Sequence, residues 1–463
     1  MAWNPYARPS LHPFIGFRQE REGGFVFNPY MTSELWLGEA EAAVVEMCDG
    51  RTPVGVMGVE LARRFRTDRA TADGRVDSTL ARLREYFALR LEGPAAPSDE
   101  RGPARDAPRQ APADCGSNAP SAGCLSAPLS ILWEITHACN LACVHCLSAC
   151  GQRHPQELTT DEALGLLDQL AALKVFWFTL GGGEPLVRPD VYDLMAHATR
   201  LNLCIRLTTN GYAVTPETME RLADVNVFSV QVSLDGMRAT HDRLRGQPGA
   251  FDRALQALEA FREHGYMILV NTAASAANVE EIPELAQLAA RIGVASMKIG
   301  PVVPLGRGAQ NRDSLGLAPA ELRHLAMQMR EVESRLRNQM ALQLDGLFCF
   351  LLEPEPQRRV PDDGVGPGCS AGVSQVVVTC DGEVYPCPYI RDRSVGSVRR
   401  QSLAEIWQNE MLAPLRQLDR SRLKGKCGGC GYRPSLCTGG CRGAAYAATG
   451  DLYAEDPNCW RGA

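Results

Sequence analysis

The sequence predicts an α/β fold in which a parallel β-sheet of alternating strands and helices lies between a small α+β module and an irregular, cysteine-rich region. Three observations predict it. Between about residues 129 and 345, short apolar runs of strand length alternate with helix-period segments. A proline-rich stretch over residues 92–128 separates this part from the N-terminal module. From about residue 346, glycines, turns and cysteines replace the alternation.

The N-terminal module is predicted over residues 14–91. Apolar positions alternate from Phe17 to Phe27 around a Gly-Gly turn, which predicts a β-hairpin. Three helical segments follow the hairpin: Ala40–Cys48, Val54–Phe65 and Val76–Phe87. This order predicts a small winged-helix-like module. Residues 92–128 mix proline with alanine, glycine and serine, and cannot bury enough apolar surface to fold, so we expect a flexible Pro/Ala-rich linker.

The central part, residues 129–345, contains six candidate strands. They are Ile131–Ile135, Val175–Leu180, Cys204–Thr208, Val227–Ser233, Met267–Asn271 and Ser296–Ile299. Helical segments lie between them, at Thr160–Leu173, Pro189–Arg200, Pro216–Ala223, Ala250–His264 and Ile282–Gly293. Successive strand–helix units predict a parallel sheet, either open or closed into a barrel. Active sites of such folds lie at the C-terminal ends of the strands. Residues 346–463 contain one expected helix, near Leu403–Glu410.

Composition and charge narrow the class of protein. The chain has 463 residues, 45% hydrophobic and 22% charged, which is typical of a globular protein of several domains. Its formal net charge is -6 and its basic residues are dispersed, so we expect no nucleic-acid partner. No signal-peptide pattern opens the chain, and no apolar run reaches ~18 residues. We therefore expect a cytoplasmic protein with no membrane segment.

Cysteine is the strongest compositional signal. Seventeen cysteines in a chain of cytosolic character do not predict a disulfide framework, and an odd number cannot pair completely. Twelve of the seventeen fall in two regions, Cys139–Cys150 and Cys369–Cys459, so metal or cluster ligation is the favoured reading. Cys115 and Cys124, in the linker, are expected to be incidental.

The first cysteine group follows the first predicted strand. Cys139, Cys143 and Cys146 form a C-x3-C-x2-C pattern. A [4Fe–4S] cluster usually takes four thiolates, so three would leave one iron open to a cofactor or substrate. Zinc, a ferredoxin-type cluster completed by Cys150, and structural thiols are the alternatives. Zinc sites more often use two C-x2-C pairs, which this segment lacks.

With these cysteines, several strand-end motifs over residues 129–301 resemble the radical S-adenosylmethionine (SAM) superfamily. The motifs are Gly181–Pro185 (GGGEP), Thr208–Gly211, Gln231–Gly236 and Arg243–Gly246. The resemblance implies a partial (β/α)6 TIM-like barrel over residues 129–345. It implies that Cys139, Cys143 and Cys146 bind three irons, while the amino and carboxylate groups of SAM chelate the fourth. The SAM contacts it implies are Gly181, Gly182, Gly183, Glu184, Asn210, Ser233 and Arg245, the last through the SAM carboxylate. Each of these could instead be a turn or surface residue.

The same resemblance implies an enzyme and a mechanism. A reduced cluster donates one electron to SAM, and the 5′-deoxyadenosyl radical that forms abstracts hydrogen from a substrate. An electron donor such as flavodoxin or ferredoxin is then required. The sequence identifies no catalytic acid or base.

The second cysteine group, over residues 346–463, resembles the SPASM extension of these enzymes, which carries two auxiliary [4Fe–4S] clusters. The resemblance assigns Cys427, Cys430, Cys437 and Cys459 to one cluster, and Cys369, Cys387 and Cys441 to the other. The fourth ligand of the latter stays open between Cys349, Cys380 and an open iron. A zinc ribbon at Cys427, Cys430, Cys437 and Cys441 is the alternative.

The N-terminal module resembles the PqqD-like peptide-recognition module through Arg21–Gly24, Asn28 and Cys48–Thr52. That module binds the leader of a precursor peptide as an added strand. The core resembles the mycofactocin maturase family through four segments, Trp133–Thr136, Cys143–Ser148, Gly181–Asp190 and Val230–Gly236. This implies oxidative modification of a ribosomally synthesised peptide, by decarboxylation or by a carbon–carbon or carbon–sulfur crosslink. A radical SAM enzyme acting on a small molecule or porphyrin is the alternative. A non-enzymatic electron-transfer or zinc-ribbon scaffold is a third.

Overall fold

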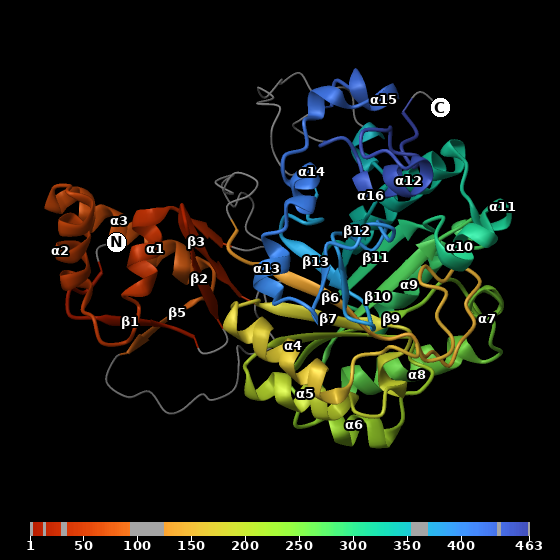
Figure 1. Cartoon of the computed structure of the whole chain (residues 1–463), viewed down its shortest axis with the longest axis horizontal. Helices are drawn as coiled ribbons and strands as arrows, with labels where there is room; N and C mark the ends of the chain where they lie inside the picture. The colour runs from red at the N-terminus through yellow and green to blue at the C-terminus, as the bar shows by residue number, and fades with distance from the viewer. Residues whose placement is uncertain are drawn as a thin grey trace. The chain divides into compact units, whose positions relative to one another are not determined.

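The computed structural model describes residues 3–12, 15–28, 35–92, 125–352, 369–432 and 437–461. Contacts divide the chain into two compact units, Met1–Ser126 and Ala127–Ala463, each of which is treated separately below (Figure 1). Most of the predicted linker, with Cys115 and Cys124, lies outside the described residues. No helix in the described ranges is long and apolar enough to cross a membrane.

The first unit contains the predicted hairpin. β2 (Gly16–Glu20) and β3 (Gly23–Phe27) pair antiparallel, and β4 (Leu35–Leu37) pairs with the other side of β3. The turn requires glycine at position 23, where φ is +130° and a Cβ would lie 2.1 Å from the Leu37 carbonyl oxygen. A second antiparallel pair, β1 (Arg8–Leu11) with β5 (Leu89–Glu92), was not predicted.

Three helices pack with this sheet. They are α1 (Glu39–Glu46), α2 (Val54–Phe65) and α3 (Arg69–Glu85). The bounds of α2 agree with the sequence prediction. α3 begins seven residues before the predicted start at Val76, because the Asp68 side chain accepts a hydrogen bond from the Thr71 amide (2.9 Å) and caps the helix there.

The second unit is built on one ten-stranded sheet, with the order β12-β11-β10-β9-β8-β7-β6-β13-β14-β15. The six predicted strands are confirmed within it, and they run parallel: β6 (Ser130–Thr136), β7 (Trp177–Gly182), β8 (Cys204–Thr209), β9 (Val227–Ser233), β10 (Met267–Ala274) and β11 (Ser296–Pro301). A seventh parallel strand, β12 (Ala341–Leu344), was not predicted. The parallel α/β fold is therefore confirmed, and its sheet is open at β12.

Helices follow the parallel strands in turn. The predicted ones correspond to α4 (Thr160–Ala172), α5 (Val191–Arg200), α6 (Pro216–Leu222), α8 (Ala250–Glu263) and α9 (Ile282–Ile292). In Figure 1, α4, α5, α6 and α8 lie along one side of the sheet. α7 (Arg238–Arg245), α10 (Gly306–Gln310), α11 (Arg312–Leu315) and α12 (Pro319–Leu336) were not predicted. Alternate side chains of β10 are buried and half-buried, so one face of this strand packs in the core and the other is more open.

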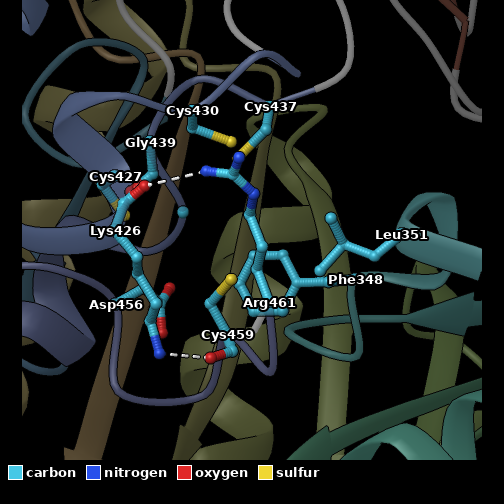
Figure 2. A pocket seen from close by; sticks show the side chains of 11 residues that line it. Phe348, Leu351, Lys426, Cys427, Cys430, Cys437, Gly439, Asp456, Cys459 and Arg461 are labelled. Carbon is cyan, nitrogen blue, oxygen red and sulfur yellow. Dashed lines mark hydrogen bonds between the residues drawn. The ribbon is translucent and has the colours of Figure 1, made fainter. Parts of the chain in front are cut away.

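The cysteine-rich region is less irregular than its sequence predicts. β13 (Gln375–Val378) pairs parallel with β6, and β14 (Glu383–Tyr385) and β15 (Gly396–Ser397) continue the sheet. The predicted helix appears as α13 (Leu403–Trp407), and three more follow, α14 (Ala413–Arg416), α15 (Gly425–Gly428) and α16 (Arg442–Thr449). Beyond the sheet, this region forms a pocket lined by four cysteines (Figure 2).

Candidate iron–sulfur sites

The first cysteine group lies in a closed loop at the C-terminal end of β6. The Cys139 amide donates to the Gly151 carbonyl oxygen (2.8 Å), and the Gly151 amide donates to the carbonyl oxygen of His137 (3.0 Å). These two bonds close the segment between them into a loop, which is called the cluster loop below. It carries Cys143 and Cys146 as well as Cys139, so the structure places all three at one strand end.

The glycines of the GGGEP motif hold this loop. The Gly183 amide donates to Thr136 O (2.8 Å), and the Glu184 amide donates to Ala138 O (2.9 Å). A Cβ on Gly183 would lie 2.0 Å from that Ala138 oxygen. Gly182 has φ +106°, and a Cβ there would lie 2.7 Å from Thr136 O. Because only glycine permits this approach, the end of β7 packs directly against the backbone before Cys139.

Glu184 connects the ends of β7 and β8. Its carboxylate is fully buried and accepts hydrogen bonds from the Thr209 hydroxyl (2.9 Å) and the Asn210 amide (2.7 Å). Burial raises the pKa of Glu184 to about 7. The Asn210 side chain in turn donates to Asn140 Oδ1 (2.7 Å) and lies 4.0 Å from Cys139 Sγ. The predicted SAM contacts Glu184 and Asn210 therefore also form a bridge from β8 to the cluster loop.

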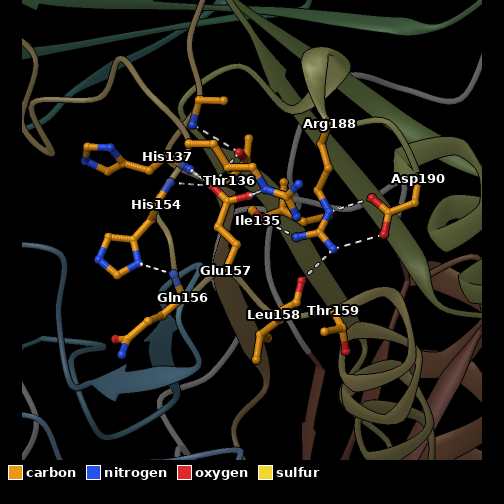
Figure 3. Close-up of polar contacts among 12 residues, drawn as sticks. Ile135, Thr136, His137, His154, Gln156, Glu157, Leu158, Thr159, Arg188 and Asp190 are labelled. Atoms are coloured by element: carbon orange, nitrogen blue, oxygen red, sulfur yellow. Dashed lines mark hydrogen bonds and ion pairs between the residues drawn. The ribbon is translucent and has the colours of Figure 1, made fainter.

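Two further side chains fix the start of the loop and were not singled out from the sequence (Figure 3). Buried Glu157 accepts hydrogen bonds from the Thr136 hydroxyl (2.8 Å) and the His137 amide (2.8 Å). Buried Arg188 donates to Ile135 O (2.8 Å) and Leu158 O (2.9 Å). Together they hold the last residues of β6, and their only sequence signal was that Arg188 follows the GGGEP motif.

Arg245 lies behind the cluster loop in a buried ion pair. Its guanidinium contacts Asp235 Oδ2 (2.5 Å) and Cys143 Sγ (3.6 Å), and His145 Nε2 lies 3.1 Å from the same Asp235 oxygen. Although burial opposes ionisation, Arg245 and His145 hold the pKa of Asp235 well below its usual range. The residue predicted to pair with the SAM carboxylate is thus placed against a cluster cysteine. The predicted contact Ser233 lies at the end of β9, half-buried.

Arg307, in α10, is far from the cluster loop in sequence but binds to its backbone. Its guanidinium donates to Cys143 O (2.6 Å) and Cys150 O (2.9 Å), and its amide donates to Cys146 O (2.9 Å). The side chain of Cys150 hydrogen-bonds to Cys146 and lowers the pKa of the Cys146 thiol, and Arg307 acts in the same direction. No motif in the sequence points to this arginine.

This arrangement fits a [4Fe–4S] cluster. Sulfur donors are the ligands that such clusters take, and a thiolate-bound cluster is anionic. Arg307 lies against the loop and supplies a compensating positive charge, while Arg245, whose charge is balanced by Asp235, donates a hydrogen bond to Cys143 Sγ. The fourth cysteine of the loop, Cys150, is buried. Burial also raises the pKa of Cys139, to about 11.

Figure 2 shows the second site. Cys427, Cys430, Cys437 and Cys459, the four residues assigned above to one auxiliary cluster, line a single pocket. Lys426 donates to the Cys459 carbonyl oxygen, and Arg461 donates to Lys426 O (3.4 Å). Four thiols and two cations around one pocket fit an anionic iron–sulfur cluster.

The third group combines Cys369, Cys387 and Cys441. Burial raises the pKa of Cys387 to about 12, and the other two thiols act in the same direction, so the three lie within electrostatic reach of one another. Gly443 lies close to this group, since a Cβ there would lie 2.9 Å from Cys387 Sγ. The Tyr389 amide donates to that sulfur (3.4 Å).

The candidates for a fourth ligand lie in other surroundings. Cys349 is in the 3-10 helix η3 (Cys349–Leu352), near Glu333 and Arg330. Cys380 follows β13 and lies near Glu157 and Asp381. The fourth ligand therefore stays a prediction.

Asp456 contacts both sets of cysteines in the C-terminal region. This buried carboxylate accepts a hydrogen bond from the Cys441 amide (2.5 Å) and also lines the pocket of Figure 2. Cys459 lines that pocket and Cys441 does not. The predicted auxiliary cluster uses Cys459, whereas the zinc-ribbon alternative would use Cys441. In the described ranges, no three His, Cys, Asp or Glu side chains converge on one metal-ion position.

Comparisons with known families and proteins show the family to which this chain belongs. The profile of the "Radical SAM superfamily" matches residues 133–289, and an "Iron-sulfur cluster-binding domain" (SPASM) matches residues 369–431. The AdoMet-dependent heme synthase of Methanosarcina barkeri is 36% identical over 345 residues, covering 72% of this chain and 97% of that protein. The mycofactocin maturase MftC of Mycobacterium tuberculosis is also 36% identical, over 73% of this chain and 84% of its own length.

Solved structures share the fold. SuiB from Streptococcus suis, crystallised with S-adenosylmethionine, superposes with a TM-score of 0.68 over 97% of this chain and 99% of its own, at 18% identity. The SAM-bound anSMEcpe superposes with a TM-score of 0.57 over 72% of this chain and 95% of its own, at 19% identity. At these identities the likeness concerns the fold alone.

Proposed function

We propose that this protein oxidatively modifies a ribosomally synthesised precursor peptide. The premise is that the chain belongs to the radical SAM superfamily and is an enzyme with SAM and [4Fe–4S] cofactors. One observation carries the peptide assignment. The likeness to SuiB extends over 97% of the chain and thus includes fold outside the catalytic core. SuiB has also been crystallised with its precursor peptide SuiA.

The N-terminal unit offers a strand edge for a leader peptide. In the three-stranded sheet β3 is central, and the Trp36 carbonyl oxygen of β4 accepts a hydrogen bond from Arg82 of α3 (2.9 Å). Because the amide and carbonyl of one residue point to the same side of an antiparallel strand, the Trp36 amide also faces this outer edge. A peptide added there would gain a main-chain hydrogen bond from the Trp36 amide, while the Trp36 carbonyl oxygen is already bound by Arg82; strand addition of this kind is a known recognition mode.

In the core, we assign Cys139, Cys143 and Cys146 to the SAM-binding cluster. When bound and reduced, this cluster supplies the electron that cleaves SAM to a 5′-deoxyadenosyl radical. The cluster loop is held from β7, β8, α7 and α10, which fixes the thiols before SAM binds. Gly181, Gly182, Gly183, Glu184, Asn210, Ser233 and Arg245 surround the strand ends where SAM would lie.

The C-terminal cysteines provide an exit for the substrate electron. We assign Cys427, Cys430, Cys437 and Cys459 to one auxiliary cluster, and Cys369, Cys387 and Cys441 to the other. An oxidised product requires that an electron leave the substrate radical, and a neighbouring cluster can accept it. Reduced flavodoxin or ferredoxin would supply the first electron, in a reducing compartment such as the cytoplasm.

A second candidate function is radical modification of a porphyrin or other small molecule. The heme synthase of M. barkeri favours this second candidate. It is as identical to this chain as the mycofactocin maturase is, and the match covers nearly the whole length of the heme synthase. A porphyrin or other small molecule has no leader peptide and needs no leader-binding module. The two candidate functions therefore differ in whether the reaction depends on the N-terminal unit.

The deciding experiment co-expresses the enzyme with each short peptide that the DNA beside its gene could encode and measures the peptide's mass. A mass change with the wild type, reduced at least about tenfold in Trp36→Pro, supports the peptide assignment. Trp36→Phe, which keeps the amide, is the matched control and should behave as the wild type. An unchanged peptide, together with a mass change on added coproporphyrin III, would support the second candidate instead.

A further inference from the structure

A row of polar side chains crosses four neighbouring parallel strands near the predicted SAM site. Ser233, Asn271, Lys298 and Gln343 are successive partners on β9, β10, β11 and β12. Partners in a parallel ladder point to the same face of a sheet. The row therefore begins at a predicted SAM contact, and Lys298 is two strand spacings away, at roughly 10 Å.

Lys298 is open to solvent although its strand is flanked on both sides. Its side chain is 45% exposed, whereas Met297 and Ile299, which point to the other face, are fully buried. An exposed lysine on an interior strand means that this face of the sheet is uncovered at β11. It therefore places a cation on an accessible surface beside the strand ends where active sites of such folds lie.

The partner of Lys298 is Asp345, directly after β12. The Lys298–Asp345 ion pair is 2.8 Å long, and the aspartate side chain is 57% exposed. Exposed pairs of this kind contribute little to stability, so the lysine can exchange this partner at small cost. The pair is thus poorly explained as a stabilising feature and is well placed to bind an incoming anion.

Asp345, the partner of Lys298, leads into a contact with the cysteine-rich region. A Cβ on Gly346, the next residue, would lie 3.9 Å from the Asn458 side chain of the cysteine-rich region. The row that begins at the predicted SAM contact Ser233 therefore leads, through Lys298 and β12, towards Asn458, the residue before Cys459 of a candidate auxiliary site.

We propose that Lys298 binds a carboxylate of the substrate and so determines which carbon faces the radical source. This inference rests on the proposed function and adds a requirement to it: the substrate presents a free carboxylate at the reacting end. A peptide C-terminus and a porphyrin propionate share this chemistry. A charge-assisted hydrogen bond from an ammonium to a carboxylate is stronger than a neutral one, which gives the site its selectivity.

The test measures ligand retention by the anaerobically reconstituted holoenzyme with SAM, using ultrafiltration and mass spectrometry. One probe is a pool of N-acetylated octapeptides with every C-terminal residue, as free acids and as amides. The other is coproporphyrin III and its tetramethyl ester. The variants are Lys298→Gln and Asp345→Asn. The matched control is Lys424→Gln, which removes another solvent-exposed lysine–aspartate pair, Lys424–Asp451, far along the chain.

The wild type and Lys424→Gln should retain the acid form of one probe at least about tenfold better than its amide or ester. Lys298→Gln should lose this preference, while Asp345→Asn, which removes the competing carboxylate, should strengthen it. The probe that is retained identifies the source of the carboxylate. Iron content shows whether each variant has folded.

Equal retention of acid and neutral forms by the wild type, including no retention of either, would overturn the inference. So would an acid preference that survives in Lys298→Gln, or one that Asp345→Asn abolishes. The proposed function is judged separately by the mass change of the precursor peptide, so each can fail without the other.

Discussion

Gly183 lies against Ala138 so closely that a single added carbon would come within 2.0 Å of the Ala138 carbonyl oxygen. Ala138 directly precedes Cys139, so the third glycine of the GGGEP motif supports the cluster loop as well as the predicted SAM site. The neighbouring Gly181 differs, because a Cβ there would make only ordinary contacts, at 3.8 Å and 3.9 Å.

The first prediction compares these two glycines. Gly183→Ala should displace the cluster loop, and the reconstituted protein should lose about four of about twelve irons per chain. Reductive SAM cleavage should fall about 100-fold, as a 1 Å misplacement can cause. Gly181→Ala should retain the full iron content. Equal iron content in the two variants would show that the loop does not depend on this contact.

The second prediction concerns Arg307. Its guanidinium donates to two carbonyl oxygens of the cluster loop, so Arg307→Gln should make the SAM-binding cluster labile. Loss of iron to a chelator under anaerobic conditions should be several-fold faster than in the wild type. Arg312→Gln, which alters an exposed arginine of the adjacent α11, is the control and should show the wild-type rate. Identical rates in both variants would contradict the proposed anchoring role.

The third prediction assigns the pocket of Figure 2. Cys459→Ala should remove about four irons per chain. Because the cluster loop is separate from this pocket, SAM cleavage without substrate should remain within about twofold of the wild type. Cys48→Ala, in the first unit, should keep all the iron. A variant Cys459→Ala with undiminished iron would exclude Cys459 as a ligand.

The fourth prediction is a pH dependence at Glu184. Its pKa in the folded protein, about 7, lies above its ordinary value of 4.5 because of burial. A group whose folded pKa is raised contributes stability that is present below pH ~4.5 and is lost as the pH rises through about 7. The margin of stability of the wild type over Glu184→Gln should therefore narrow between pH 6 and pH 8, by ~1 kcal/mol. Thermal unfolding midpoints at the two pH values check this, and a widening margin would contradict it.

The strands and cysteine groups were predictable because their signals are local. Apolar runs such as Val227–Ser233 become strands with the same bounds, and three cysteines within eight residues share one loop by necessity. β12 was missed because four residues with weak alternation carry little signal. The pairing of β13 with β6 could not be read from the sequence, since a parallel ladder between distant segments has no local pattern.

The supports of the cluster loop escaped prediction for a related reason. Arg307 reaches Cys143, 164 residues away in sequence, and Asp235 contacts His145 in another distant segment, so only the folded chain brings these partners together. Asp235 lies within a motif that was recognised, but its burial with Arg245 was not visible there. The structure thus adds a positioning role to residues that the sequence marks only as SAM contacts.

The most direct test of the account is SAM cleavage by the chain with Cys139, Cys143 and Cys146 all changed to alanine. After anaerobic reconstitution and reduction with dithionite, the wild type should form 5′-deoxyadenosine, and the triple variant should form none while retaining about eight irons per chain. Formation of 5′-deoxyadenosine by the triple variant at the wild-type rate would contradict the assignment of these cysteines as the radical source.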